Sequence, residues 1–112
     1  MKIAFTASGT SWESKIDPRF GRAEFLVIYD EANGTLSSID NSSVKNEAHG
    51  AGTATAQKIF EISPDVLITG NGPGDHAATA LRHSKMKILV NAHDMTLKQA
   101  YEQYQKGLLN EF

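Results

Sequence analysis

The chain has 112 residues, 40% of them hydrophobic, which suits one domain of ordinary size, covering residues 1–112, with a buried core. Its formal net charge is −2, and acidic and basic residues are mixed along it, which argues against a nucleic-acid or membrane-surface partner. No apolar run approaches the ~18 residues of a membrane span, and the first residues do not resemble a signal peptide, so a cytoplasmic protein is expected. The absence of cysteine excludes disulfides, thiolate catalysis and metal ligation through cysteine sulfur, so a metal ligand would be a histidine, a carboxylate or a methionine.

The first part of the chain predicts strands. Residues 24–30 form a continuous apolar run, as in a strand covered on both faces. Asn33-Gly34 then predicts a hairpin turn. In the strand that follows, Leu36 and Ile39 break strict alternation, which favours an edge position or a bulge. The three predicted strands cover residues 2–7, 24–30 and 36–40.

The second part of the chain alternates helices with buried strands. Helices are predicted over residues 50–63, 75–84 and 96–107, and strands over residues 65–69 and 87–91. Pro64 ends the first helix, in which Ala56, Ile59, Phe60 and Ser63 recur at helical spacing and form the predicted stripe. Asp75 is the predicted N-cap of the second.

The last predicted helix carries the clearest signals. Thr96 and Gln99 match a capping box, and Gly107 stands where a C-terminal cap belongs. Its predicted apolar stripe consists of Leu97, Ala100, Tyr101, Tyr104 and Leu108. The order of elements is therefore strand, strand, strand, helix, strand, helix, strand, helix. A mixed five-stranded α/β sheet flanked by helices is the expected architecture, with right-handed crossovers in its second half.

The first candidate site loop is "DPRFGR", residues 17–22. Pro18 and Gly21 shape the loop, and guanidinium groups bind carboxylate or phosphate oxygens through paired hydrogen bonds. Arg19 and Arg22 are therefore candidate anion-binding residues, with Phe20 between them. Two interpretations remain open, since Phe20 would also serve as a core anchor while the arginines pair with Asp17 and Glu24.

The second candidate loop is "NEAHGAGTAT", residues 46–55, which leads into a helix. Gly50 and Gly52 let backbone N–H groups approach a ligand at the positive end of the helix dipole. His49 stands just before them and is a candidate metal ligand or hydrogen-bond donor. The alternative interpretation is a simple turn with a surface histidine.

The third candidate loop is "TGNGPGDH", residues 69–76, at the carboxyl end of a predicted parallel strand. Gly70, Gly72 and Gly74 have neither P-loop nor dinucleotide spacing, yet the backbone around Asn71 can form an anion-accepting concavity.

The histidines outside the second loop differ in their prospects as ligands. His76 is retained as a candidate metal ligand. His83 lies two helical turns further on, ~10 Å along the axis, so the two cannot share one small ion. His93 is expected to be solvated.

No catalytic constellation is visible. The serines lack a nucleophile elbow, the carboxylates stand singly, and no paired metal-binding histidine motif occurs. The sequence therefore favours a binding protein over an enzyme.

Taken in order, the loops resemble the dinitrogenase iron–molybdenum cofactor biosynthesis family. The resemblance rests on "DPRFGRAEFLVIYD", "GAGTATAQKI", "DVLITGNGPGDHAATAL" and the closing "KILVNAHDMTLKQAYEQYQKGLL", which together cover nearly the whole chain. It implies a ribonuclease-H-like fold and the storage or transfer of an iron–sulfur or iron–molybdenum–sulfur cluster. By the match of residues it further implies that His49, Gly50, Gly52 and the loop Gly70–Gly74 form the site walls, and Arg19 and Arg22 are chemically suited to such an anion. A cofactor donor or acceptor protein is the expected partner.

The resemblance has two departures. Some members of the family use a cysteine near the site and this chain has none, and the family's compact Gly-x-Gly-Pro turn is here the more polar "GNGPGDH". Two other functions stay open. The first is a small-anion or phosphate sensor that uses the same loops without metal. The second is a protein-interaction domain, which an exposed apolar patch near the edge strand would favour.

Overall fold

The structure is a computed structural model that describes residues 1–42, 51–81 and 84–112. Its elements alternate in type after the first three strands, as predicted. They are β1 (Lys2–Ala7), β2 (Phe25–Asp30), β3 (Thr35–Asp40), α2 (Ala51–Ile62), β4 (Val66–Ile68), α3 (Asp75–Leu81), β5 (Lys87–Val90), α4 (Leu97–Gln105) and β6 (Asn110–Glu111). Among the described residues, no helix has the length and apolar character needed to cross a bilayer.

The strands form one mixed α/β sheet in the order β3-β2-β1-β4-β5-β6. β1, β4 and β5 run parallel to one another. The pairs β1–β2, β2–β3 and β5–β6 are antiparallel. The predicted count of five strands is wrong, because β6 adds a sixth. Its two residues are exposed and carry no apolar alternation, so sequence periodicity gives no signal for it.

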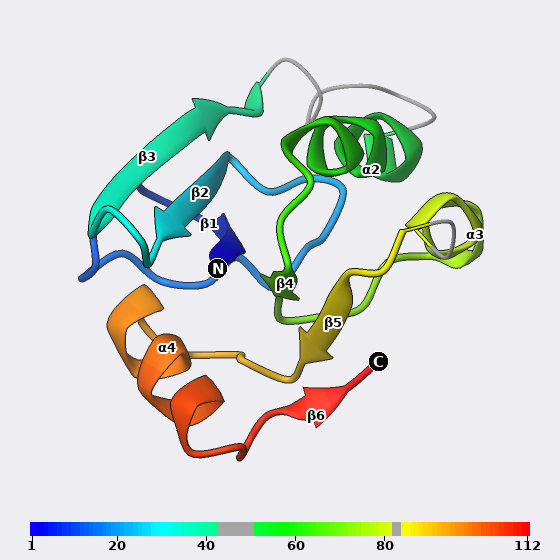
Figure 1. The fold of residues 1–112 in the computed structure, drawn as a ribbon. Coiled ribbons are helices and arrows are strands. Elements are labelled where there is room, and N and C mark those ends of the chain that lie inside the picture. The colour runs from blue at the N-terminus through cyan, green and yellow to red at the C-terminus, as the bar shows by residue number, and fades with distance from the viewer. Residues whose placement is uncertain (43–50, 82–83) are drawn as a thin grey trace.

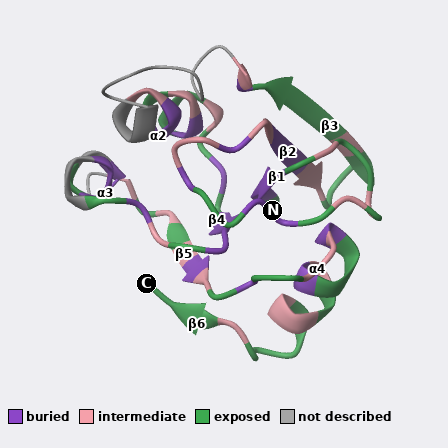
Figure 2. Cartoon of the chain, turned by 180° about the vertical axis from the view of Figure 1, so that it is seen from behind, coloured by how far each residue is buried: buried purple, intermediate pink, exposed green. Residues whose placement is uncertain are grey.

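β3 lies at the edge of the sheet, as the broken alternation of its sequence suggested. Its pairing with β2 is continuous from Phe25 opposite Asp40 to Asp30 opposite Thr35, so no bulge interrupts it. The turn before it contains Gly34 with φ of 67°, which fits the predicted hairpin. Figure 2 shows β3 largely exposed, in contrast to the buried central strands.

Helices cover both faces of the sheet, with α2 and α3 on one side and α4 on the other (Figure 1). Alternate residues of β1 face the two layers. Ile3 and Phe5 join the core beneath α4, and Ala4 joins the core beneath α2 and α3. In β2, Leu26 and Val27 likewise belong to opposite cores, which explains the continuous apolar run of this strand.

The end of α2 shows where the apolar stripe was misjudged. Ala56 and Ile59 are buried, but Phe60 is 45% exposed, so its predicted place in the stripe is wrong. Neighbouring helical residues point about 100° apart, and Ile59 already faces the core. The helix ends before Ser63, whose φ of 53° turns the chain toward Pro64.

The two ends of α4 confirm both predicted caps. The Thr96 side chain accepts from the Gln99 N–H, and the Gln99 side chain accepts from the Thr96 N–H. Gly107 has φ of 70° and donates to the Tyr104 carbonyl. Leu108 is 63% exposed, because the helix ends at Gln105 and leaves this residue beyond its apolar stripe.

Candidate functional site

The predicted loops lie together at the end of the sheet where the parallel strands finish. The carboxyl ends of the parallel strands β1, β4 and β5 lie at this end, the usual ligand position in open α/β sheets. The Asn71 N–H donates to the Pro18 carbonyl at 2.9 Å, so the loop after β4 is bonded to the loop before β2. The Thr55 hydroxyl of α2 donates to the Gly21 carbonyl at 3.0 Å. The described parts of all three predicted loops therefore meet.

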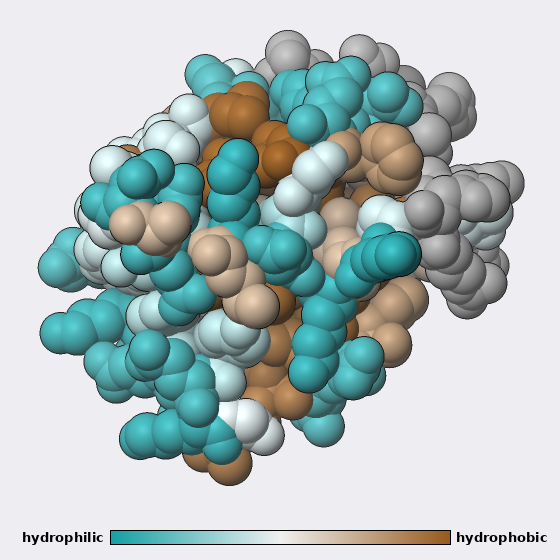
Figure 3. Space-filling view, viewed as in Figure 1, coloured by the Kyte–Doolittle hydropathy of each residue, from teal (hydrophilic) through white to brown (hydrophobic). Residues whose placement is uncertain are grey.

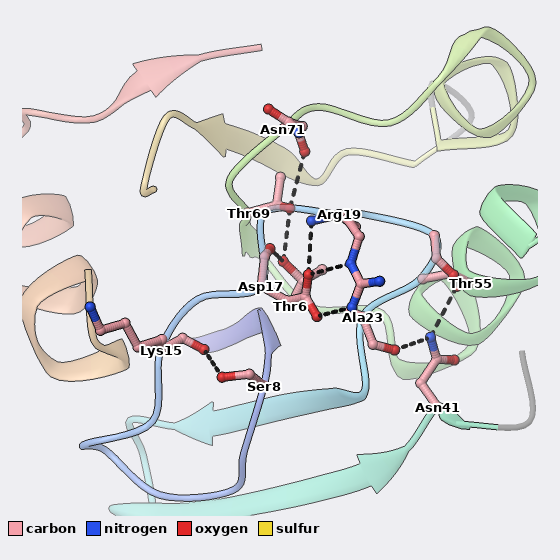
Figure 4. Close-up of polar contacts among 11 residues, drawn as sticks. Thr6, Ser8, Lys15, Asp17, Arg19, Ala23, Asn41, Thr55, Thr69 and Asn71 are labelled. Carbon is pink, nitrogen blue, oxygen red and sulfur yellow. Dashed lines mark hydrogen bonds and ion pairs between the residues drawn. The ribbon is translucent and has the colours of Figure 1, made fainter. Parts of the chain in front are cut away.

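A buried polar network holds these loops in place. The hydroxyls of Thr6 and Thr69, both fully buried at the ends of β1 and β4, lie 2.8 Å apart. The Thr6 hydroxyl also contacts the Asp17 carbonyl, and the Asp17 N–H donates to the Thr6 carbonyl at 2.9 Å. The Thr69 hydroxyl donates to the Asn71 carbonyl (Figure 4). Buried polar groups are stable only when bonded, so each loop is tied to a strand end.

Asp17 and Arg19 form an ion pair at the rim of this network. Asp17 is 4% exposed, and its carboxylate accepts from the Arg19 backbone N–H at 2.9 Å. Arg19 Nε and Nη2 donate to its two oxygens, each at 3.2 Å (Figure 4). The hydrogen bond to Asp17 raises the pKa of the Arg19 guanidinium, with the Asp17 charge adding to it. The guanidinium is thus permanently charged and fixed in orientation, while the Arg19 side chain stays 58% exposed.

This pair lies beside a groove of about 630 Å³. The groove is lined by Ser8, Lys15, Ile16, Asp17, Pro18, Arg19, His93 and Asp94. Figure 4 shows the Lys15 side chain directed away from Arg19, so the two cations do not converge on one point. Among the described residues, Arg19 Nη1 has no bonding partner, which leaves its N–H groups available to a bound anion.

His93 is the site residue that sequence reasoning missed. It is exposed, as predicted, but it lines the groove opposite the Asp17 loop. Asn91 and Asp94 on either side of it have φ of 67° and 62°. Asn and Asp tolerate this left-handed conformation better than other residues with a Cβ. A histidine flanked by Asn and Asp just after a parallel strand was therefore the feature of the sequence that could have indicated a site residue.

The glycines of the third loop serve different purposes. A Cβ on Gly70 would lie 2.6 Å from the Pro18 Cα and 3.0 Å from His93 Nδ1, so close packing of loops requires glycine here. A Cβ on Gly72 would lie 2.5 Å from Cδ1 of Phe112. A Cβ on Gly74 would meet nothing within 4 Å. Protein neighbours, rather than a ligand, account for Gly70, whereas the Phe112 ring beside Gly72 belongs to a 54% exposed side chain that can move aside.

The remaining candidates are spread over different environments. Phe20 is 3% exposed and packs in the core beneath α2 and α3, which confirms it as an anchor. Arg22 is half-buried and does not line the groove. His49 and Gly50 lie outside the described residues. Gly52 lies in α2 and His76 in α3, at positions whose side chains are not described.

Comparison with known proteins identifies the family. Residues 1–107 match the dinitrogenase iron-molybdenum cofactor family. The chain belongs to this family. Both the recognition made from the loops and the α/β fold are thereby confirmed.

Two solved structures are similar to this member of the dinitrogenase iron-molybdenum cofactor family over almost its full length. The apo form of the orange protein from Desulfovibrio gigas is 32% identical, with a TM-score of 0.91, over 99% of this chain and 92% of that one. A NifB-like protein of the DUF35 family from Thermotoga is 27% identical, with a TM-score of 0.82, over 98% and 91% of the two chains. No curated protein sequence matches the chain.

The donors at the groove fit an anionic cluster better than a bare metal ion. The chain has no cysteine, and its described residues contain no group of three His, Asp or Glu side chains able to hold a metal. Fixed N–H donors such as those of Arg19 suit sulfide or oxide acceptors on the outside of a preformed cluster. The buried Asn41 Oδ1 has no hydrogen-bond partner among the described residues, but as an acceptor it would not attract an anion.

Proposed function

We propose that this protein is a non-enzymatic carrier or chaperone for an anionic iron–sulfur or iron–molybdenum–sulfur cluster. The cluster is cargo, bound in the groove that Arg19 and His93 line and passed on during metallocofactor biosynthesis. The observation that carries the proposal is the Arg19 guanidinium, held by Asp17 so that its remaining N–H groups are free for an acceptor in the groove. The family description, which names the iron–molybdenum cofactor, supports the same class of cargo.

The binding chemistry follows from directed hydrogen bonds more than from net charge. The groove lining contains two cations, Lys15 and Arg19, and two carboxylates, Asp17 and Asp94. Asp17 is already bonded to Arg19, so its role is to orient the guanidinium before cargo arrives. His93 adds one imidazole that can donate a hydrogen bond or ligate a metal atom of the cluster. Such a site binds reversibly, as transfer to another protein requires.

The same proposal includes the setting of the protein. A carrier needs a protein that supplies the cluster and one that receives it, and metallocofactor assembly places it in the cytoplasm. A ribonuclease-H-like classification of the fold is supported by the mixed sheet, in which the antiparallel hairpin β2–β3 joins the parallel strands β1, β4 and β5. Fold class alone does not bring nuclease chemistry.

A second candidate, binding of a phosphate-like anion without metal, is favoured by one observation. An arginine fixed by a carboxylate also suits phosphate oxygens, and the described residues offer no cluster of metal ligands. An interaction domain gains less support. Among the described residues, the exposed large hydrophobic side chains are those of Met1, Ile39, Phe60, Leu108 and Phe112, which are scattered along the chain, and Figure 3 shows hydrophobic patches interrupted by hydrophilic surface.

Anaerobic titration of the purified protein separates the two candidates. The probes are tetrathiomolybdate, alone and with ferrous iron, a synthetic [4Fe–4S] cluster, and inorganic phosphate. Gel filtration with elemental analysis measures retained metal, and thermal unfolding measures stabilisation by phosphate. The variant is Arg19→Gln, and Lys87→Gln removes the same charge at the opposite edge of the sheet as a matched control.

We expect a metal–sulfur probe to be retained by the unmodified protein and by Lys87→Gln. Loss of a charge-assisted hydrogen-bond pair should weaken retention by Arg19→Gln at least about tenfold. Equal retention by both variants would refute the role of Arg19. Phosphate stabilisation without metal retention would establish the second candidate instead.

A further inference from the structure

The last strand lies against the loop that carries His93 and against the glycine loop after β4. In β6, Asn110 pairs with Val90 and Glu111 with Leu89 of β5, and the Phe112 N–H donates to the Ile88 carbonyl at 2.8 Å. Figure 1 shows β6 at the edge of the sheet, beside β5. Beyond this short ladder, the side chains of Asn110 and Phe112 reach the loops.

The first contact is with the loop that carries His93. Asn91 Nδ2 donates to Asn110 Oδ1 at 3.0 Å. Asn91 itself holds a left-handed backbone with φ of 67°, and its N–H donates to the Gly70 carbonyl at 2.9 Å. Asn110 therefore bonds to the residue at which the chain turns from β5 toward His93 and meets the glycine loop.

The second contact is with the glycine loop. The Phe112 ring lies over Gly72, so close that a Cβ there would approach Cδ1 at 2.5 Å. The ring also borders a hollow of about 470 Å³. Ala78, Leu81, Met86 and Ile88 contribute apolar lining to this hollow, and Ser84 and Glu111 contribute polar lining. Room is thus available beside the ring, which is 54% exposed where it lies.

We propose that residues 110–112 form a releasable strap that holds both loops and thereby sets the position of His93 in the groove. Asn110 holds the His93 loop through Asn91, and Phe112 holds the glycine loop by covering Gly72. Release moves the Phe112 ring away from Gly72 into the neighbouring hollow and loosens both loops. The effect of release on cargo rests on the function proposed above, whereas the effect on the loops does not.

The balance of contacts favours release over permanent closure. β6 has two residues, both exposed, and its attachment to β5 is a short ladder at the sheet edge. Elements with few buried contacts open at a fraction of the free energy of global unfolding. The Asp17 wall of the groove, in contrast, is tied by the buried network of Thr6 and Thr69. The strap can therefore open while the groove stays folded.

Amide hydrogen exchange tests the strap without any cargo. The test variants are Asn110→Ala and Phe112→Ala, and Leu108→Ala is the matched control because it removes a 63% exposed apolar side chain from the same tail. The reporters are the N–H groups of Asn71, Asn91 and Ala92, which bond to the carbonyls of Pro18, Gly70 and Thr69. The Ser63 N–H, which donates to the Ile59 carbonyl, is the reference amide at the opposite end of the sheet.

We expect both test variants to exchange about tenfold faster at the three loop amides while Ser63 is unchanged, since only local opening is affected. Leu108→Ala should match the unmodified protein. Unchanged loop exchange in both test variants would overturn the strap. Faster exchange at Ser63 as well would show general destabilisation and would equally count against it.

Cargo measurements keep the two proposals distinct. With tetrathiomolybdate and ferrous iron as the probe, a working strap predicts release of metal about tenfold faster from Phe112→Ala than from Leu108→Ala. If the loops loosen but no form of the protein retains metal, the function proposed above fails and the strap stands. If metal is retained equally by all forms and loop exchange is unchanged, the strap fails and the function stands.

Discussion

The two ends of the sheet differ in whether their polar groups are buried or exposed. Every buried polar or charged residue in the described parts of the chain belongs to the end where β1, β4 and β5 finish, and these residues are Thr6, Asp17, Asn41, Thr55 and Thr69. At the other end, polar contacts are exposed, as in the 2.8 Å bond from the Lys2 N–H to the Asp65 carboxylate. A hollow of about 340 Å³ there is lined by Phe60, Ser63, Pro64, Asp65, Ser84, Lys85 and Met86.

This difference teaches where function is to be sought. Burying a polar group is costly unless it is bonded, so a fold concentrates such groups only where loops must be held in fixed positions. The carboxyl end combines this network with the oriented Arg19 and the groove. The opposite end has a hollow but no comparable ion pair among its described residues. A hollow alone is therefore a poor guide to the site.

The largest effect is expected from Gly70→Ala at the carboxyl end. The new Cβ would meet the Pro18 backbone and His93, and overpacking of this kind costs about 2–3 kcal/mol. Gly74→Ala in the same loop has open space and should cost less than about 0.5 kcal/mol. Urea unfolding measures both. Equal costs for the two variants would show that the loop is not held against Pro18.

Next in size is Asp17→Asn. The substitution removes the charged acceptor from Arg19 at a position 4% exposed, and we expect a loss of about 2 kcal/mol. At the opposite end, Asp65→Asn changes an exposed acceptor and should cost less than about 1 kcal/mol. Both values come from urea unfolding at neutral pH. A larger loss for Asp65→Asn would break the comparison between the two ends.

A smaller effect is expected from Thr69→Val. The change keeps side-chain volume but removes the hydroxyl bonded to Thr6 and to the Asn71 carbonyl, for a cost of about 1–2 kcal/mol. Ser84→Ala at the other end removes a half-exposed hydroxyl bonded to the Leu81 carbonyl and should cost about 0.5 kcal/mol or less. Thermal unfolding distinguishes them as a difference of several degrees. Similar melting temperatures for the two variants would contradict the ranking.

The smallest effect on stability is expected at an exposed polar contact near the end that carries Asp65, the bond from the Tyr101 hydroxyl to Glu31. This bond, together with burial, raises the pKa of Tyr101 to about 12. Because the folded pKa lies above the ordinary value of 10, the contribution to stability is present below pH 10 and is lost as the pH rises toward 12. Glu31→Gln should lower the Tyr101 midpoint in an absorbance titration at alkaline pH. An unchanged midpoint would show that Glu31 is not the cause.

The sequence predicted those features that depend on neighbouring residues. The capping box of Thr96 and Gln99 and the cap at Gly107 are spaced within one or two helical turns, so the pattern is visible in a short window. The convergence of the loops also followed, since the carboxyl ends of parallel strands share one edge. For Arg19 the sequence left two roles open, and the structure shows its pairing with Asp17.

Features that depend on distant residues could not be predicted in this way. The need for glycine at position 70 comes from Pro18, which is far away in sequence, and Gly72 lies against the ring of Phe112, which is also distant in sequence. β6 forms because β5 offers a free edge, not because its own two residues alternate. His93 joins the groove through the left-handed turns at Asn91 and Asp94. No spacing rule links these positions.

The most direct test of the account is to map binding on the folded protein by NMR. Amide and arginine Nε signals would be followed during anaerobic titration with tetrathiomolybdate, alone and with ferrous iron. The account predicts saturable shifts at Arg19, Gly70 and His93, with Asp65 and Lys85 at the opposite end unchanged. Shifts confined to the end that carries Asp65 and Lys85, or no saturable shifts with either probe, would contradict the assignment of the groove as the cluster site.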